Sequence, residues 1–177
     1  APMPHNTMVQ CMAVVIKSDG KDEWADDVLQ ERDWKQLDSK EIIELIKKAG
    51  VVGCGGATFP AHVKFTPNKP VDTFIVNAAE CEPYLTCDYR AMVEAPYIEK
   101  LVTGVQIIMK ALGVKRGFIG IEDNKPEAVS KLTEAFKDIP EVSVEPCITK
   151  YPQGAEKMMI EAMTGRQVEP GGLPMNV

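Results

Sequence analysis

The sequence predicts an α/β protein with a mostly parallel, Rossmann-like sheet and helices on both faces. Three apolar runs of strand length predict buried strands, at 71–80, 116–122 and 141–149. Each of these runs is followed by residues with helical periodicity, and an alternating order of strands and helices favours parallel pairing. The carboxyl ends of parallel strands meet at one edge of the sheet, where ligands bind in such folds.

The helices are predicted from periodicity and from the residues at their ends. Asp38 and Ser39 are typical of a helix start, and Gly50 of a helix end. Pro96 is expected to stop a short helix, and Pro126 to lie in the first turn of another. We expect helices at about 39–50, 88–96, 97–112, 125–138 and 154–165.

The chain is expected to contain three parts: a strand-bearing segment at 1–20, a polar connector at 21–38, and the α/β domain at 39–177. Residues 9–17 alternate and are rich in valine and isoleucine, which predicts a strand. The chain opens without a methionine, and its last residues, GGLPMNV, predict a turn into a further strand. We therefore expect an excised piece of a larger protein.

Composition excludes several classes of function. The chain has 177 residues, a net charge of −6 and a pI of about 5.0, so a broad basic face for nucleic acid is not expected. No apolar run approaches the roughly 20 residues of a membrane span. The cysteines are odd in number and lack CxxC spacing, which favours a reducing compartment and predicts no metal site; they are Cys11, Cys54, Cys81, Cys87 and Cys147.

The stretch GVVGCGGATFP, residues 50–60, matches neither standard phosphate loop. It lacks GxxxxGK followed by Ser or Thr, it has Thr58 where the dinucleotide fingerprint has glycine, and it follows a helix rather than a strand. Its glycines nevertheless let the backbone approach a flat or anionic ligand, and Lys64 supplies a positive charge. A tight turn needs only one or two glycines, so we interpret Gly53, Gly55 and Gly56 as part of a binding loop.

A second candidate group, NAAECEP, follows the first predicted strand. Asn77 offers a donor and an acceptor, and Glu80 and Glu82 offer carboxylates that could act as general acid and base. The two histidines, His5 and His62, form no nucleophile motif with a cysteine or serine, and His62 is interpreted as a helix-surface residue. Hydrolase mechanisms therefore have little support.

Three motifs together, GVVGCGGATFPAHVKF, NAAECEPYLTCDYR and YPQGAEKMMIEAMTG, closely resemble the RnfC family. This family supplies the NADH-side subunit of the Rnf ion-translocating electron-transport complex. The motifs resemble more distantly the flavin-carrying, NADH-oxidising subunit of respiratory complex I. The resemblance covers about residues 39–177, and the opening strand looks like the end of the small β-rich module that precedes the flavin domain in RnfC.

The resemblance implies that the α/β domain binds FMN and NADH. The implied FMN contacts are Gly53, Gly55, Gly56, Lys64, Asn77, Glu80, Tyr151 and Gly154. The implied NADH contacts are Phe59, Lys64, Glu82 and Glu156. The chemistry is the cofactor's, so no catalytic side chain is implied, and the protein supplies position and electrostatics.

The chain departs from the complex I pattern at Ala79 and Ala155, where that pattern has acidic residues. The absence of these two carboxylates changes the electrostatic field around the flavin, and it leaves open which residues contact the nucleotide. A later flavin-contacting segment, and the cysteine-rich domains that carry 4Fe-4S clusters, would follow Val177.

The function implied is hydride transfer from NADH to FMN and electron transfer onward to iron–sulfur clusters, at the cytoplasmic face of the membrane. Ion translocation would belong to partner subunits of the Rnf complex, and the 177-residue piece alone is expected to be inactive. Two alternatives stay open: a related flavin protein that feeds a reductase such as proline reductase, and a non-catalytic docking module. The ion, the oligomeric state and the choice between NADH and NADPH are not predicted.

Overall fold

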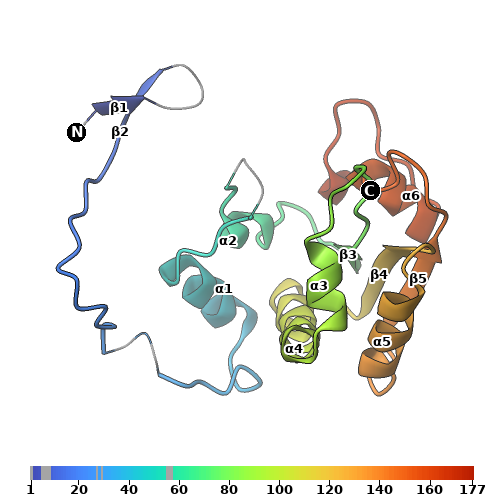
Figure 1. Ribbon diagram of the computed structural model, residues 1–177, viewed down its shortest axis with the longest axis horizontal. Helices are drawn as coiled ribbons and strands as arrows, with labels where there is room; N and C mark the ends of the chain where they lie inside the picture. Colours follow the sequence, from blue (N-terminus) through green and yellow to red (C-terminus); the bar gives the residue numbers. More distant parts are fainter. Residues whose placement is uncertain (1, 5–8, 27, 29, 55–57) are drawn as a thin grey trace. The chain divides into compact units, whose positions relative to one another are not determined.

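The structure is a computed structural model that describes residues 2–4, 9–26, 28, 30–54 and 58–177 (Figure 1). The chain divides into two compact units, Ala1–Arg32 and Asp33–Val177, which are described separately. The first unit contains β1 Pro2–Pro4 and β2 Gln10–Met12. The second contains α1 Ser39–Lys48, α2 Ala61–Lys64, β3 Thr73–Asn77, α3 Asp88–Val93, α4 Ala95–Leu112, β4 Arg116–Glu122, α5 Pro126–Phe136, β5 Val142–Cys147, α6 Glu156–Thr164 and the 3₁₀ helix η1 Pro174–Asn176.

The three strands of the second unit form one parallel sheet in the order β3-β4-β5. Asn77, the last residue of β3, pairs with Gly120, and Glu122, the last residue of β4, pairs with Cys147. The three carboxyl ends therefore lie at one edge of the sheet. The parallel sheet predicted from the apolar runs is confirmed.

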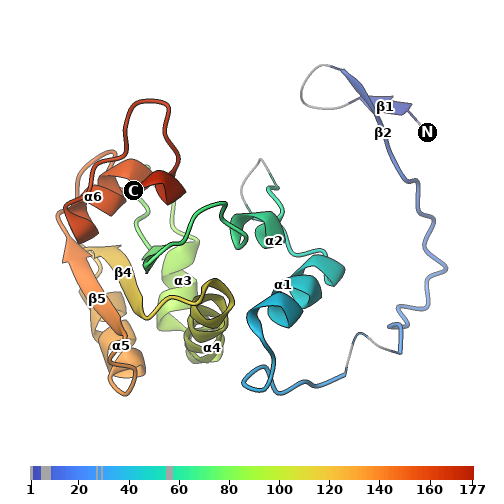
Figure 2. The same cartoon turned by 180° about the vertical axis from the view of Figure 1, so that it is seen from behind.

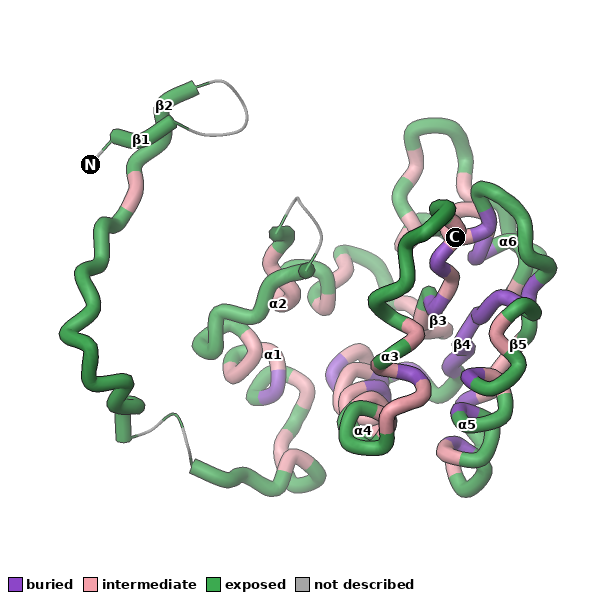
Figure 3. The backbone as a smooth tube through the Cα atoms, viewed as in Figure 1, coloured by how far each residue is buried: buried purple, intermediate pink, exposed green. Residues whose placement is uncertain are grey.

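Helices cover both faces of this sheet (Figures 1 and 2). On one face, Ile119 and Ile121 of β4 belong to a core cluster with residues of α3, α4 and α5, and both are fully buried. The intervening residue, Gly120, faces the other way, where a Cβ would overlap Sδ of Met159 in α6. Neighbouring residues of a strand point to opposite faces, so α6 covers the second face. Figure 3 shows the buried residues gathered on the sheet and on the inner sides of these helices.

The helix starting at Ser39 has the cap that its sequence predicts. The Asp38 carboxylate accepts the backbone N–H of Glu41 at 2.9 Å, and the Glu41 carboxylate accepts that of Asp38 at 2.7 Å. The Ser39 hydroxyl donates to the carbonyl of Ala111 at the end of α4. These bonds satisfy backbone groups that a helix end leaves unpaired, and they join α1 to α4.

Two expected boundaries differ in the second unit. Pro96 does not end α3 but lies in the first turn of α4, because proline lacks only an N–H that is unpaired there anyway. The chain breaks instead at Glu94, whose backbone is extended. The strand expected after Gly172 is also wrong: Pro174–Asn176 form a 3₁₀ helix, whose Asn176 side chain accepts the N–H of Leu173 at 2.7 Å.

In the first unit, the predicted strand 9–17 is shorter than expected. β2 spans Gln10–Met12 and pairs antiparallel with β1. A strand extends only as far as its partner supplies hydrogen-bonding groups, and β1 has three residues, two of them proline. Val14, Val15 and Ile16 are exposed.

No helix within the described residues combines the length and the apolar character needed to cross a bilayer.

Candidate functional site

Three loops leave the carboxyl edge of the parallel sheet, and we call them the strand-end loops. They are residues 78–87 after β3, residues 123–125 after β4, and residues 148–155 after β5. Their contacts define the geometry of the candidate site, because ligands of open α/β sheets bind at this edge.

Asn77 joins the first and third strand-end loops. Its amide nitrogen donates to the carbonyl of Gly154 at 2.7 Å, and its amide oxygen accepts the N–H of Ala79 at 3.2 Å. A Cβ on Gly154 would lie 3.0 Å from Sγ of Cys81 and 3.1 Å from the carbonyl oxygen of Ala79. Glycine thus permits the close approach of the two loops, and two residues predicted for the site, Asn77 and Gly154, are in direct contact.

Glu80 is buried and fully bonded within the protein. One carboxylate oxygen accepts the N–H groups of Cys87 and Asp88, each at 2.6 Å, and the other accepts that of Tyr89 at 3.3 Å. The carboxylate therefore caps the first turn of α3 from seven residues upstream. Burial raises the pKa of Glu80, but the N–H groups of Asp88 and Cys87 and the charge of Lys125 outweigh it, so the pKa lies below its usual value.

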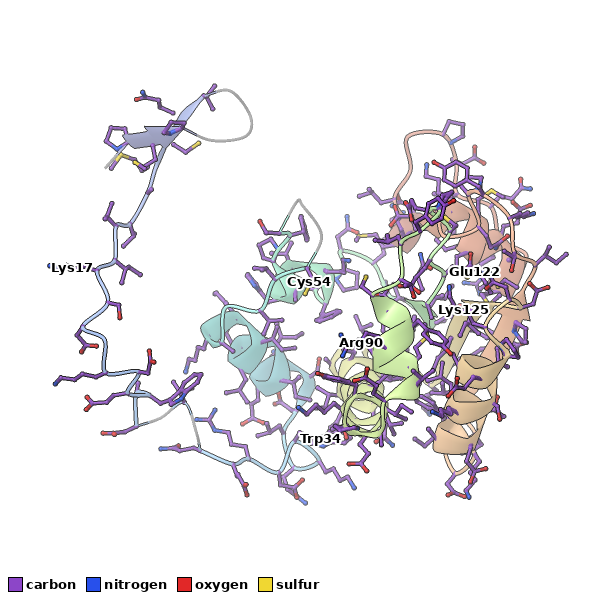
Figure 4. The ribbon with its side chains drawn as sticks, in the orientation of Figure 1. Lys17, Trp34, Cys54, Arg90, Glu122 and Lys125 are labelled. Carbon is purple, nitrogen blue, oxygen red and sulfur yellow. The ribbon has the colours of Figure 1, made fainter. Side chains whose placement is uncertain are left out.

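Glu122 and Lys125 hold the same loop from the neighbouring strand (Figure 4). The Glu122 carboxylate accepts the N–H of Glu80 at 3.0 Å and the Lys125 ammonium at 2.6 Å. The Lys125 ammonium also lies 3.4 Å from the Glu80 carboxylate, and both carboxylate side chains are only 2% exposed. The sequence places Glu122 and Lys125 near the end of a strand but assigns neither of them a role.

A further contact joins the second and third strand-end loops. The Asp123 carboxylate accepts the hydroxyl of Thr149 at 2.6 Å and its N–H at 3.0 Å. Both bonds hold the pKa of Asp123 below its usual value, and the bond from the Thr149 hydroxyl has the larger effect. All three strand ends are thus cross-connected by polar side chains.

Gln153 is a buried polar residue whose side chain bonds to no described residue. The residue is 3% exposed, and its side-chain amide makes no hydrogen bond with any described residue. Because no fully buried side-chain polar atom of the described residues lacks a partner, the Gln153 amide retains some contact with solvent. The sequence gives no direct signal for Gln153, although it lies between the predicted residues Tyr151, which is 72% exposed, and Gly154.

The described residues on the two sides of the glycine loop pair in an antiparallel bridge between Val52 and Pro60. Gly53 donates its N–H to the carbonyl of Phe59 at 2.9 Å, and Ala61 donates to Val51 at 3.0 Å. The N–H of Gly53 is therefore occupied and cannot bind a phosphate in this conformation. A Cβ on Gly53 would come no closer than 3.8 Å to another atom. Gly55 and Gly56, also predicted to contact a ligand, lie outside the described residues.

The other predicted residues are exposed. Lys64 ends α2, Phe59 is 49% exposed, Glu82 lies in the first strand-end loop, and Glu156 begins α6. Lys64, Glu82 and Glu156 form no ion pair within the described part of the chain. The glycine loop shares no hydrogen bond or ion pair with the strand-end loops among the described residues, so its contacts to a shared ligand stay predictions. His62 lies in α2 and is half-buried.

One group of potential metal ligands occurs near the site. Glu80, Cys87 and Asp88 place one ligand atom each within 4.8 Å of one another. The Glu80 oxygens already accept three N–H groups, and the Cys87 thiol donates to the Asp88 carboxylate, a bond that raises the thiol pKa. These internal bonds account for the group, and we infer no metal site from it.

Comparison with known proteins identifies the family. The chain is 54% identical over 98% of its length to the C subunit of a proton-translocating ferredoxin:NAD+ oxidoreductase complex of Clostridium ljungdahlii, and 45% identical over 97% to that of a Na+-translocating complex of Acetobacterium woodii. It is 38% identical over 98% to the corresponding polypeptide of an ion-translocating oxidoreductase complex of Vibrio cholerae. The chain spans 38%, 39% and 22% of these relatives, respectively. The resemblance to RnfC is confirmed.

A solved structure has a similar fold. A crystal structure of an NAD+-reducing nickel–iron hydrogenase matches with a TM-score of 0.63 and 26% identity, over 76% of this chain and 26% of that one. The family model described as the Nuo51 FMN-binding domain matches residues 46–177. The chain therefore belongs to the Nuo51 FMN-binding domain family.

Proposed function

We propose that this chain is the flavin domain of an RnfC-type subunit that carries electrons between NADH and iron–sulfur clusters in an ion-translocating complex. The observation that carries the proposal is the cross-connected edge of the parallel sheet, where Asn77 and Gly154 are in contact and the Gln153 amide lacks a partner among the described residues. Membership of an FMN-binding family indicates which ligand this edge would take.

The residues at the strand ends fit FMN chemically. The isoalloxazine ring has hydrogen-bond donors and acceptors along one edge, and an amide such as that of Gln153 can serve either kind. Asn77 is exposed and keeps one N–H and one lone pair beyond the bonds it already makes. Lys64 is an exposed ammonium without an ion pair in the described structure, as a phosphate contact requires.

When bound, FMN supplies the redox chemistry, since it exchanges a hydride with NADH and single electrons with a cluster. The residues of the chain itself would bind and orient the flavin. The bond between Asn77 and Gly154 holds the third strand-end loop against the end of β3. Tyr151 would lie beside the flavin, and Glu80, whose carboxylate is bonded within the protein, would hold the neighbouring loop in place. Gly53, Gly55 and Gly56 would give the phosphate or ring room to approach, and no side chain needs to gain or lose a proton.

The exposed aromatic and acidic residues are proposed for the nucleotide. Phe59 offers a ring face for stacking, and the carboxylates of Glu82 and Glu156 can accept hydrogen bonds from ribose hydroxyls. Ala79 and Ala155 leave this chain with less negative charge than the complex I pattern has near the flavin. We expect that difference to make approach of a nucleotide phosphate easier.

The wider setting rests on the relatives. We propose that residues 1–20 belong to a β-rich module, that 21–38 are a connector, and that 39–177 are the flavin domain. Partner subunits would translocate the ion, the 4Fe-4S clusters would lie in further domains, and the subunit would sit peripherally on the cytoplasmic face of the membrane. The piece alone would bind FMN weakly and be inactive. A reductase-feeding protein is not favoured, because the similar proteins cited above are complex subunits.

A flavin titration of the complete subunit tests the proposal. The wild type should bind one FMN, show a flavin visible spectrum and reduce an artificial acceptor with NADH. Asn77→Ala should weaken FMN binding about tenfold or more, since it removes a contact that sets the loop spacing. Asn68→Ala is the matched control, because Asn68 is exposed and makes no side-chain hydrogen bond with a described residue. A colourless subunit that binds neither FMN nor NADH would instead support a docking module.

A further inference from the structure

A largely buried lysine bridges two buried carboxylates at the strand ends. The Lys125 side chain is 12% exposed, and its ammonium contacts Glu122 at 2.6 Å and Glu80 at 3.4 Å. Buried ions persist only where partners compensate for the lost hydration. This group of three, which we call the strand-end triad, carries a net charge of −1 and lies where β3 and β4 end.

The other two members of the strand-end triad contact Glu80 at two points. Glu122 accepts the backbone N–H of Glu80, and Lys125 pairs with its side chain. The Glu80 side chain in turn holds the N–H groups of residues 87, 88 and 89. Both ends of the first strand-end loop are therefore fixed through a single residue, whose charge Lys125 balances.

We propose that Lys125 is a positioning residue for the flavin site, acting through Glu80 on the loop at 78–87. The proposal rests on the proposed function for its ligand, but its structural part stands on the contacts alone. Without Lys125, two buried carboxylates would face each other with no cation between them. The charged form of each would then be disfavoured, and Glu80 would release the start of α3.

A second link between α3 and α5 does not substitute for the triad. The Tyr89 hydroxyl donates to Glu127 at 2.9 Å, and Glu127 pairs with Lys131 at 2.8 Å. The Lys131 and Glu127 side chains are 43% and 56% exposed, so water screens this pair. Lys131 lies in α5, the helix that Lys125 precedes as its N-cap residue, and its ammonium donates to the carbonyl of Val93 at the end of α3 at 2.8 Å. It therefore provides a control that removes a lysine contact between α5 and α3 without touching Glu80.

The test compares Lys125→Met, Lys125→Arg and Lys131→Met in the complete subunit. Amide hydrogen exchange at Cys87, Asp88 and Tyr89, measured without FMN, should be at least about tenfold faster in K125M and unchanged in K131M. The FMN dissociation constant of the folded K125M molecules should rise at least about tenfold. K125R should retain most of the slow amide exchange and most of the FMN affinity of the wild type, because it keeps the positive charge.

The outcomes separate the two claims. A role in stability alone predicts fewer folded K125M molecules with an unchanged FMN dissociation constant, and that result overturns the proposal. Unchanged exchange at residues 87–89 also overturns it. A wild type that binds no FMN refutes the proposed function and the ligand of this site, while the exchange data still decide whether Lys125 holds the loop. If K125M does not fold, K125M/E122Q, which removes one carboxylate with the lysine, should fold and show the fast exchange.

Discussion

Replacing Glu80 with glutamine should destabilise the chain by about 3 kcal/mol. Hydrogen bonds to charged groups contribute about 1.5–3 kcal/mol each, against about 0.5–1.5 for neutral ones. The two bonds from Cys87 and Asp88 would be weakened accordingly, for a loss of about 2 kcal/mol. The new amide nitrogen would face the Tyr89 N–H or the Lys125 ammonium, donor against donor, at a further cost of about 1 kcal/mol.

Urea denaturation of the 177-residue chain measures this loss. With a slope of about 1–3 kcal/mol per molar urea, a loss of about 3 kcal/mol should lower the midpoint by about 1–3 M at unchanged slope. Glu82→Gln is the control, because Glu82 lies in the same loop, is exposed and forms no ion pair in the described structure, so its change should stay within about 0.5 kcal/mol. A Glu80→Gln loss no larger than that of Glu82→Gln would refute the reasoning.

The Glu80→Gln variant also tests how the free energy of unfolding depends on pH. The pKa of Glu80 is lower in the folded chain than in the unfolded one, so its contribution to stability is complete above the unfolded pKa of about 4.3. That contribution is lost as the pH falls through the lower, folded pKa. The groups facing Glu80 are Lys125, Glu122, Cys87 and Asp88. The difference in unfolding free energy between wild type and Glu80→Gln should therefore be constant from about pH 6 to 7 and shrink below about pH 4.3.

Three further predictions concern other parts of the second unit. Leu132→Ala should cost about 2–5 kcal/mol in a urea titration, because Leu132 is fully buried in the core, and a cost below about 1 kcal/mol would contradict the packing described. Hydrogen bonds from the side chains of Arg166, with the larger effect, and Thr73 lower the pKa of Asp72 to about 2. Arg166→Gln should therefore raise the pKa of Asp72 in an NMR titration. An unchanged pKa would show that the pair of Arg166 and Asp72 does not form in solution. Gln153→Ala should weaken FMN binding by the complete subunit roughly 2- to 10-fold, the equivalent of one neutral hydrogen bond, and equal affinity would exclude the amide as a ligand contact.

The sheet and its helices could be predicted because their signals are local. The apolar runs at 71–80, 116–122 and 141–149 contain β3, β4 and β5, and α1 begins after the predicted cap Asp38 and ends just before Gly50. The boundary at Pro96 was misplaced because proline suits both the end of one helix and the first turn of the next. The strand at 9–17 was overextended because its length depends on a partner that alternation does not reveal.

The strand-end triad could not be predicted, because its members come from two separate strand ends. Glu80 and Glu122 are 42 residues apart in sequence, and only the register of β3 with β4 brings them together. The sequence places Lys125 at the start of a predicted helix and gives it no partner. Glu80 was correctly placed at the strand end, but that its carboxylate caps α3 follows only from the path of the loop.

The most direct test of the account is a crystal structure of the complete subunit with FMN. We expect the isoalloxazine ring within about 4 Å of Asn77 and Gln153, over the carboxyl ends of the three strands. FMN bound away from this edge, with the strand-end loops in contact only with solvent or protein, would contradict it.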